Sequence, residues 1–364
     1  MHTSKWQLFR FSLVYLSSQT TIFLIPVLVD TSGYQGWIAL IGGGFLSLII
    51  LFFTMQVGCL RKDQGWIEFG NEIMGKWVHR LMVLMLLCWC IYYTALDIEN
   101  FVLFFGSNYM RGTSPIFIIT VIGLVIMYCA TLGLSTIICM ADGIFLIFFA
   151  AILLSVYLFI PYADFSMLPA FLHYHDPGLA INDSISTMSW LAEWVVFLFV
   201  APEFKIGIKM LKNLAVTGIC LLFIILSAWV LTMLNFGPHL GSELQYPFLD
   251  MIRSSSHHNI LGNMDPILIG IWSASMFIHG SFLMYISAKC AMYLTHQKGR
   301  KYMVPLLMGC SMIIAYLYSI NNTIIYYRDF NANLTIYLWL FVECIPVYYY
   351  IVAVIRSKIS PAVK

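Results

Sequence analysis

Charged residues are scarce in this chain. Asp, Glu, Lys and Arg make up only 10% of its 364 residues, against about 25% in soluble domains. Hydrophobic residues make up 61%, and the mean hydropathy is +0.86. The sequence contains no phosphate-binding Gly-Lys-Ser/Thr loop, which excludes a fused ATPase. We therefore expect an integral membrane protein that is not an enzyme, needs no cofactor or metal, and binds no nucleic acid.

Cysteine forms no CxxC pair, and none of the nine cysteines lies in a loop expected to face the exterior. All of them lie within apolar segments or at their ends, where cysteine packs as a small hydrophobe. We expect such packing, with metal binding or redox chemistry as the alternative.

Ten apolar segments are long enough to cross about 30 Å of hydrocarbon, which takes about 20 residues. Only 131–135 separates the fourth segment from the fifth. The predicted spans lie near 8–29, 36–60, 78–105, 114–132, 136–160, 184–201, 214–236, 264–288, 302–321 and 334–355.

Lys and Arg alternate strictly between the gaps that separate these spans. Sixteen of the 19 fall in every second gap, and the other three are Arg111, Arg253 and Arg328. Cations accumulate on the cytoplasmic side of membrane proteins. The alternation predicts a multi-pass protein of the inner membrane of a cell or spore, in contact with lipid, with both termini cytoplasmic.

Ten spans divide into five and five. Because five is odd, a second copy of a five-helix unit enters the membrane from the opposite side, which is a recurrent transporter architecture. We expect an all-α fold with ten transmembrane helices and a 5+5 inverted repeat. Residues 1–364 form one permease-like domain, with repeat one at about 8–160 and repeat two at about 184–355.

Polar residues interrupt the first span and its counterpart, the sixth. Ser17–Thr21 lies in the middle of the first span, while Ser184, Ser189 and Glu193 belong to the sixth. Five consecutive polar residues place hydroxyls all round a helix, as expected where backbone lines a cavity. The alternative is that these hydroxyls bond to carbonyls of their own helix or of a neighbour.

Ionisable residues inside the spans are costly, at about 2.5 to 3.5 kcal/mol for an acid at the bilayer centre. They are Asp97, Glu99, Glu193, His279 and Glu343. Asp97 and Glu99 are two residues apart, so only one of them can line a given cavity. Glu193 suits proton coupling or recognition of an ammonium group. A fixed structural hydrogen bond is the alternative for Glu193, and structural roles are the alternative for His279 and Glu343.

Other polar residues lie near the ends of spans or in the long exterior loops. Asp142 and Asp265 are expected to be interfacial or to cap their helices. The loops at 161–183 and 237–262 hold five histidines. Metal binding or pH sensing is one interpretation of these histidines, and scattered surface histidine is the other.

Several short motifs occur in a characteristic order. They are Gly75-Lys76-Trp77 before the third span, Thr113-Ser114-Pro115 at the start of the fourth, 165–169 (Phe-Ser-Met-Leu-Pro), Tyr246-Pro247, and 263–272 (Asn-Met-Asp-Pro-Ile-Leu-Ile-Gly-Ile-Trp). With the length and the ten-span layout, the chain resembles the spore-germination B-subunit permeases (the GerAB-like family). That family belongs to the amino acid–polyamine–organocation superfamily, and the resemblance covers nearly the whole chain.

The resemblance implies a LeuT-like core in the inner membrane of dormant spores. There such a chain works with an A subunit and a lipoprotein C subunit as a nutrient germinant receptor, whose ligands are amino acids, sugars or nucleosides. Relatives often have glycines in the first span, where this chain has Ser17–Thr21, so a different ligand class is open. Carried over by position, the substrate site lies among spans one, three, six and eight, at Ser18, Gln19, Thr20, Tyr93, Asp97, Ser189, Glu193, Ser275 and His279.

Three functions fit these observations. The first is the B subunit of a germinant receptor that binds a small polar solute, an amino acid by preference, and signals to its partner subunits. The second is a proton- or sodium-coupled amino acid permease. The third is a membrane scaffold for partner subunits, and the polar clusters in spans one and six weigh against it.

Overall fold

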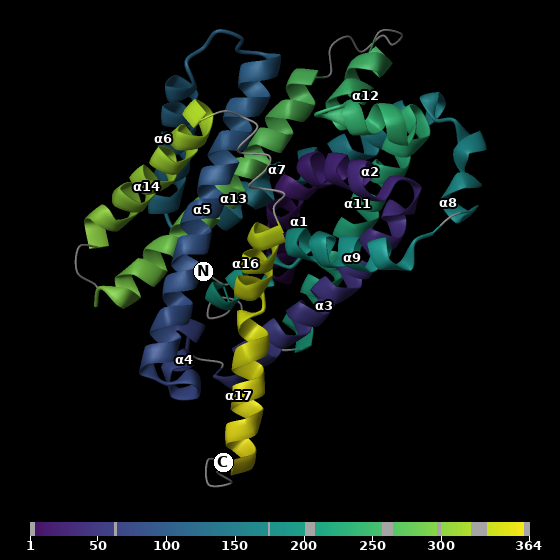
Figure 1. The fold of residues 1–364 in the computed structure, drawn as a ribbon. Coiled ribbons are helices and arrows are strands. Elements are labelled where there is room, and N and C mark those ends of the chain that lie inside the picture. Colours follow the sequence, from purple (N-terminus) through teal and green to yellow (C-terminus); the bar gives the residue numbers. More distant parts are fainter. Residues whose placement is uncertain are drawn as a thin grey trace.

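The computed structural model describes residues 4–61, 64–173, 175–200, 208–256, 265–296, 300–321 and 333–359. Every regular element within these residues is a helix (Figure 1), which confirms the all-α fold. The first half of the chain contains α1 (Lys5–Gln19), the π-helix η1 (Thr20–Leu24), α2 (Ile25–Ser32), η2 (Gly33–Gln35), α3 (Gly36–Leu60), α4 (Trp66–Met74), α5 (Lys76–Asn108), α6 (Pro115–Thr131) and α7 (Leu134–Phe159).

The second half begins with short elements and then repeats the pattern of long helices. The linking elements are η3 (Ile160–Tyr162), η4 (Phe165–Met167) and α8 (Ala170–His173). The helices that follow are α9 (Pro177–Leu191), η5 (Glu193–Phe199), α11 (Ile208–Glu243), α12 (Pro247–Ser256), α13 (Asp265–Leu294), α14 (Arg300–Asn321), α16 (Asn333–Glu343) and α17 (Ile345–Ile359).

Length and apolar composition identify most of the expected spans. Among the described residues six helical stretches are long and apolar enough to cross a membrane, and the stretch Lys5–Leu60 contains the first two predicted spans. The tenth span is a bent pair, Thr335–Glu343 with Ile345–Arg356, at an angle of 44°. The fourth, Pro115–Thr131, is shorter. The sixth span, α9 with η5, does not meet this criterion of length and hydropathy, because it is polar and its helix is broken.

Local sequence explains where several helices begin and end. Asp176 accepts hydrogen bonds from the backbone amides of Gly178 (2.8 Å) and Leu179 (3.2 Å), and so caps α9. Gly133, with φ at +87°, ends α6 and allows α7 to start at once. The short gap between the fourth and fifth spans is therefore a true boundary.

One end of the bundle is cationic. At this end the side chain of Asn213 donates to the carbonyl of Lys5 (3.2 Å), and Arg80 on α5 contacts His296 beyond α13 (2.9 Å). The described Lys and Arg residues of this cationic end are Lys5, Arg10, Arg61, Lys76, Arg80, Lys209, Lys212, Lys289, Arg300, Lys301, Arg356 and Lys358.

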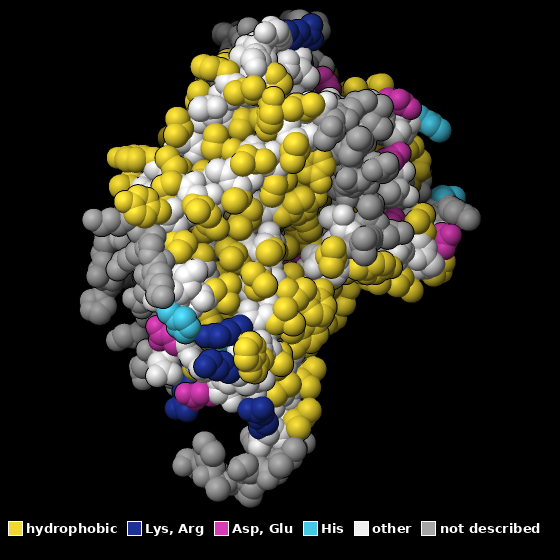
Figure 2. Space-filling model, turned by 60° about the vertical axis from the view of Figure 1, so that its left-hand side comes forward, with side chains coloured by type: hydrophobic (Ala, Val, Ile, Leu, Met, Phe, Trp, Pro, Cys, Tyr) yellow, Lys and Arg dark blue, Asp and Glu magenta, His cyan; other side chains and the backbone are white. Residues whose placement is uncertain are grey.

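The opposite end is acidic. Trp37 at the start of α3 donates to the carbonyl of Phe171 (3.1 Å), which brings α8 to this end. Figure 2 shows a broad hydrophobic band on one face of the molecule, with Lys and Arg gathered below it. Within the described ranges, Arg111 and Arg253 are the cations of the acidic end, and its acids include Asp30, Asp164, Asp176, Asp183, Glu243 and Asp250.

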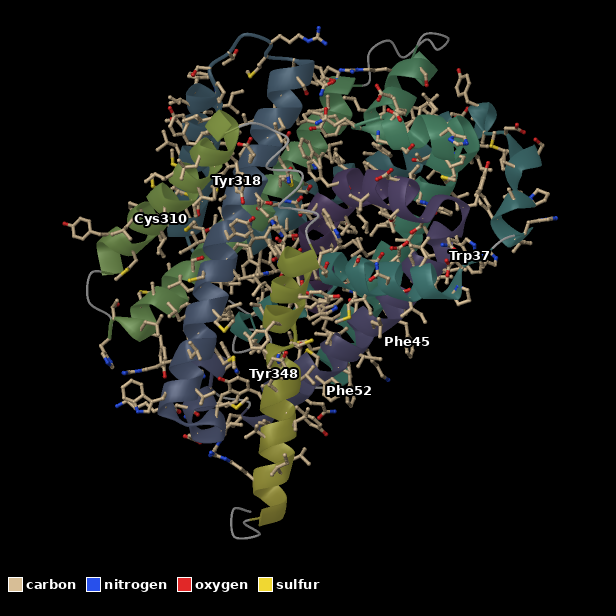
Figure 3. All side chains as sticks on the ribbon, in the orientation of Figure 1. Trp37, Phe45, Phe52, Cys310, Tyr318 and Tyr348 are labelled. Atoms are coloured by element: carbon tan, nitrogen blue, oxygen red, sulfur yellow. The ribbon has the colours of Figure 1, made fainter. Side chains whose placement is uncertain are left out.

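The distribution of polar side chains is the inverse of that in a soluble protein. Gln19, Asp97 and His279 are buried in the interior. Large apolar side chains instead face outward, among them Leu146 (74% exposed) and Tyr157 (73% exposed). Figure 3 shows Phe45 and Phe52 projecting from α3 away from the bundle. An apolar belt around a polar interior is the arrangement that a lipid bilayer stabilises.

Small residues bring the sixth span close to the second. A Cβ atom on Gly43 of α3 would lie 2.7 Å from Cβ of Thr187 on α9. Glycine therefore lets the two backbones approach, as small residues do between membrane helices. This contact fixes the position of α9 just before the chain breaks at Ala192.

Candidate functional site

The site begins at the break in the sixth span. Helix α9 ends at Leu191, Ala192 leaves the helical conformation with ψ at 24°, and Glu193 opens the 3-10 helix η5. Glu193 is 1% exposed. Irregular backbone at this depth is tolerated where protein surrounds it. The break turns Glu193 towards α1, α5 and α13.

His279 of α13 bridges two acids. Its Nδ1 lies 2.7 Å from Oδ2 of Asp97, and its Nε2 lies 3.0 Å from Oε2 of Glu193. Both distances are those of hydrogen bonds between the imidazole and a carboxyl group. The three side chains therefore form one buried titratable cluster, in which two acids share a single base.

Two tyrosines complete the surroundings of Glu193. Tyr15 donates its hydroxyl to Oε2 (2.6 Å), and Tyr93 donates to Oε1 (2.8 Å). The ring of Tyr15 also stacks on His279, with centroids 4.7 Å apart and planes at 24°. Tyr93 meets the same imidazole edge-on at 4.8 Å. Both carboxylate oxygens of Glu193 are therefore occupied by protein donors.

The network continues from Asp97 into α1. Oδ1 of Asp97 accepts a hydrogen bond from Nε2 of Gln19, and Oε1 of Gln19 accepts one from Nδ2 of Asn100 (3.2 Å). A buried network of this kind stores protons or meets a cationic or hydroxylated solute, and it becomes costly when one member is lost. We call it the His279 network, and its members are Tyr15, Gln19, Tyr93, Asp97, Asn100, Glu193 and His279.

Comparison with known sequences assigns the chain. Residues 3–324 match the family described as spore germination protein. The chain belongs to this family. Among curated proteins, spore germination protein XB of Bacillus anthracis is 24% identical over 318 residues, which cover 85% of this chain and 87% of that protein. The resemblance to germination permeases is thereby confirmed.

Solved structures show the fold that this spore germination family member shares. A sodium-coupled sialic acid symporter, in its substrate-bound outward-open state, matches with a TM-score of 0.68 at 14% identity, over 97% of this chain and 78% of its own. The inward-facing conformation of Mhp1 matches with a TM-score of 0.52 at 15% identity, over 92% and 73%. Both have the LeuT fold, so the predicted LeuT-like architecture is confirmed.

Five of the nine expected site residues meet in the His279 network, namely Gln19, Tyr93, Asp97, Glu193 and His279. They come from four separate helical segments, α1, α5, η5 and α13. Their assignment to solute binding remains a prediction.

The four expected serines and threonines bond within their own helices. Ser18 donates to the carbonyl of Tyr15 (2.8 Å), Thr20 to Leu16 (3.1 Å), Ser189 to Ser186 (2.7 Å) and Ser275 to Trp272 (2.7 Å). The hydroxyls of the first-span cluster therefore follow the alternative of local bonding.

The backbone of the same cluster makes the contact between helices. The carbonyl of Ser18, at the entrance to the π-helix, accepts a hydrogen bond from the indole of Trp272 (3.0 Å). Short π-helical stretches often occur at functional sites. The interruption in the first span is thus a π-helical turn rather than an unwound segment.

Sequence reasoning missed Tyr15 and Asn100. Tyr15 precedes Gln19 by four residues, and Asn100 follows Asp97 by three, so each lies on the same helix face as a residue that was singled out. Helical spacing could have indicated both. Asp142, expected near an end of its span, lies towards the cationic end and pairs with Arg10 at 2.5 Å, which joins α7 to α1.

The other interior acids lie outside the network. Glu99 faces away from Asp97 and accepts a hydrogen bond from Ser319 of α14 (2.6 Å), as the two-residue spacing requires. Glu343 lies at the bend between α16 and α17 and is completely buried, and within the described ranges neither of its carboxylate oxygens has a hydrogen-bond partner.

A metal site in the exterior loops finds no support in the described part of the chain, where no group of three or more His, Cys, Asp or Glu side chains could hold an ion. His257 and His258, two of the five loop histidines, lie outside the described residues, as does Arg328.

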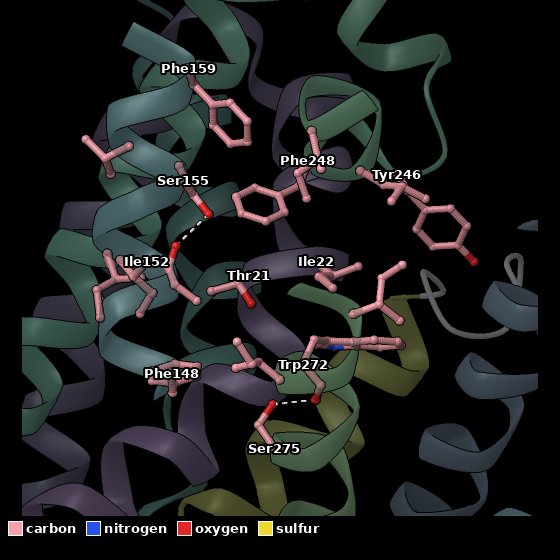
Figure 4. A pocket seen from close by; sticks show the side chains of 18 of the residues that line it. Thr21, Ile22, Phe148, Ile152, Ser155, Phe159, Tyr246, Phe248, Trp272 and Ser275 are labelled. Atoms are coloured by element: carbon pink, nitrogen blue, oxygen red, sulfur yellow. Dashed lines mark hydrogen bonds between the residues drawn. The ribbon is translucent and has the colours of Figure 1, made fainter. Parts of the chain in front are cut away.

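An apolar cavity of about 90 Å³ lies between α7, α11, α12 and α13 (Figure 4), and no member of the His279 network lines it. Figure 4 shows Ser155 and Ser275 in its wall, each bonded to a carbonyl of its own helix. Ser275 therefore faces this cavity instead of the network. A smaller space of about 30 Å³ is bounded by Tyr93, Ser189, Trp190, Thr335, Ile336 and Trp339. It leads to the tyrosine that donates to Glu193.

Proposed function

We propose that this chain is the B subunit of a nutrient germinant receptor, which binds a small polar solute in the membrane interior and signals spore germination. Membership of the spore germination family supports this role. The observation that carries it is the bridge from Asp97 through His279 to Glu193, since two buried carboxyl groups that share one imidazole, with no Lys or Arg among their described partners, are costly unless they are used.

The geometry suggests how a solute would be sensed. Tyr93 both lines the small cavity and donates to Glu193. A solute with its own donor can displace Tyr93 and bind the freed oxygen. Glu193 lies at the break between α9 and η5, so such an exchange alters the joint of a broken helix. Binding shifts the conformational equilibrium by its differential affinity for the two states.

The remaining parts of the proposal concern the surroundings of the chain. We infer an inner-membrane location with both termini and the cationic end cytoplasmic. Partners are the A subunit and the lipoprotein C subunit, by resemblance to the family. The repeats run from about 8 to 160 and from about 184 to 355 within one domain.

Spore germination with single-residue variants tests the proposal. Glu193→Gln keeps the size of the side chain and removes its charge, and Gln19→Leu removes the amide that bonds Asp97. Both variants should abolish the response to germinant while the protein level stays normal. Glu68→Gln, on the exposed face of α4, is the matched control and should germinate as the wild type does. Normal germination of both network variants would contradict the proposal.

A proton- or sodium-coupled amino acid permease is the second candidate. The unbroken chain of titratable groups from Asp97 through His279 to Glu193 favours proton coupling over a purely structural role. Uptake of labelled amino acid into proteoliposomes separates the candidates. A receptor binds without accumulation, whereas a permease accumulates solute when a proton or sodium gradient is imposed.

A further inference from the structure

A cavity at the acidic end has a volume of about 460 Å³, enough for a small solute. Its walls come from α2, α9, the end of α11 and the start of α16. We call it the acidic cavity because three carboxylates line it, those of Asp30, Asp183 and Glu243.

No described Lys or Arg lines the acidic cavity. The two described arginines of this end are engaged elsewhere. Arg111 donates to the carbonyl of Ser107 (3.0 Å), and Arg253 donates to Asn108 (3.2 Å), both beside α5. The excess of negative charge in the cavity is therefore not neutralised by a described side chain.

The face of α9 that lines the acidic cavity carries a hydroxyl group, that of Thr187, without a hydrogen-bond partner among the described residues. Asp183, Thr187 and Trp190 follow each other at spacings of four and three residues, so they share a helix face. Thr187 lines the cavity, and its buried hydroxyl has no hydrogen-bond partner among the residues that the structure describes. Asp183 is 5% exposed, and its Oδ2 accepts a hydrogen bond from Ser32 (2.6 Å). A buried hydroxyl without a partner is destabilising, and a ligand in this cavity would satisfy it.

The acidic cavity leads towards the His279 network. Its wall shares Trp190 and Ile336 with the small cavity that reaches Tyr93, the donor to Glu193. A solute on this route passes from three carboxylates to a network in which two carboxyl groups share one imidazole. The first span stays helical through Thr20–Leu24, so its backbone offers no run of free amides for an anion. A carboxylate on the solute would find no Lys or Arg among the described residues that line the route.

We propose that the acidic cavity selects solutes with a net positive charge, carried by a primary ammonium or guanidinium group, over zwitterionic amino acids. This inference rests on the proposed function and specifies the class of solute. The ammonium group bonds to Asp183 and Thr187 and lies against the ring of Trp190. Charge-assisted hydrogen bonds and cation–π contact provide the affinity. Asp30 and Glu243, at the exposed rim, attract the cation by long-range electrostatics.

The test measures binding to the full chain in phosphatidylcholine nanodiscs by calorimetry. The probes are 1,4-diaminobutane as a dication, L-alanine as a zwitterion and succinate as a dianion. Diaminobutane should bind, and the other two should not. Asp183→Asn should weaken its binding about tenfold or more, because a charge-assisted hydrogen bond is lost. Thr187→Val, which keeps the shape, should weaken it several-fold. Asp164→Asn is the control, since Asp164 is exposed at the same end outside the cavity.

A second variant guards against misfolding of Asp183→Asn. The double substitution Asp30→Asn with Glu243→Gln changes two exposed side chains, and it should slow association and reduce its dependence on salt. Unchanged diaminobutane binding in both variants would overturn the inference. Equal or tighter binding of L-alanine would also overturn it.

The two proposals fail in different ways. L-alanine binding that depends on Glu193 but not on Asp183 would leave the receptor function standing and remove the cation selectivity. Diaminobutane binding that is lost in Asp183→Asn, together with normal germination of Glu193→Gln spores, would keep the cation site and remove the receptor function.

Discussion

His279 and Tyr15 lie face to face at the centre of the bundle, with ring centroids 4.7 Å apart. Tyr15 also donates its hydroxyl to the same Glu193 oxygen that His279 contacts. One tyrosine therefore supports the imidazole by stacking and fixes the carboxylate by hydrogen bonding. The hydrogen-bond network and the aromatic packing share these residues, so we expect a substitution in one of them to alter the geometry of both.

Replacing His279 should destabilise the protein strongly. His279→Gln leaves at least one of two buried acids without its partner, and breaking a buried pair costs about 3 to 5 kcal/mol. We expect a large fall in melting temperature in detergent, with partial recovery in the double variant with Asp97→Asn. His239→Gln, on the exposed part of the chain beyond Gly237, is the matched control. Equal melting temperatures for the two glutamine variants would show that the bridge contributes nothing.

Removing the hydroxyl of Tyr15 should weaken the hydrogen bonding of the Glu193 carboxyl group. Tyr15→Phe keeps the stacking on His279 and deletes one hydrogen bond to a carboxylate, which contributes about 2 kcal/mol. Stability should fall, and the germinant concentration for half-maximal response should change. Tyr157→Phe, on the outer surface of α7 (73% exposed), tests whether any tyrosine hydroxyl has this effect. Matching behaviour of the two variants would contradict a specific role.

Gly280 leaves little room for a methyl group beside the network. A Cβ atom there would lie 3.0 Å from Cδ1 of Ile126 and 3.3 Å from Oδ2 of Asp97, which His279 holds in place. Gly280→Ala should therefore displace Asp97, lower stability by about 1 kcal/mol and reduce the germination response. Gly270→Ala on the same helix meets no atom within 4 Å. It should be neutral or stabilising, since alanine favours the helix by about 1 kcal/mol. Thermal unfolding of the Gly280→Ala and Gly270→Ala variants in parallel tests this prediction, and equal melting temperatures would contradict it.

Substitution of Glu343 by methionine should stabilise the protein, whereas the same substitution of Glu193 should destabilise it. Neither oxygen of Glu343 has a hydrogen-bond partner in the described part of the chain, whereas both oxygens of Glu193 accept hydrogen bonds. An apolar residue of similar volume in place of an unpartnered buried acid is stabilising by about 1 to 2 kcal/mol. Glu343→Met should raise the melting temperature, and Glu193→Met should lower it. A fall in both variants would mean that Glu343 has a stabilising partner in the membrane.

The sequence predicted the spans because hydropathy and charge are local properties. Gly133 separates α6 from α7 within the expected gap, and the alternation of Lys and Arg matches the cationic end of the bundle. The break at Ala192 was not predictable from composition. No glycine or proline marks it, and it exists because η5 packs inside the protein, where nearly all of its residues are buried. Polarity showed that the sixth span is unusual, and packing set the place of its break.

The features of the candidate site likewise divide into those that the sequence predicted and those that only the tertiary structure showed. By itself the sequence determined that Asp97, Glu193 and His279 lie inside the membrane, and that Asp97 and Glu99 face different sides, because these facts follow from position along single helices. The tertiary structure decided that His279 bridges two acids and that Ser275 faces an apolar cavity. Such contacts depend on the rotation and depth of each helix against its neighbours, and they join residues far apart in the sequence, such as Asp97 and His279, which are 182 positions apart.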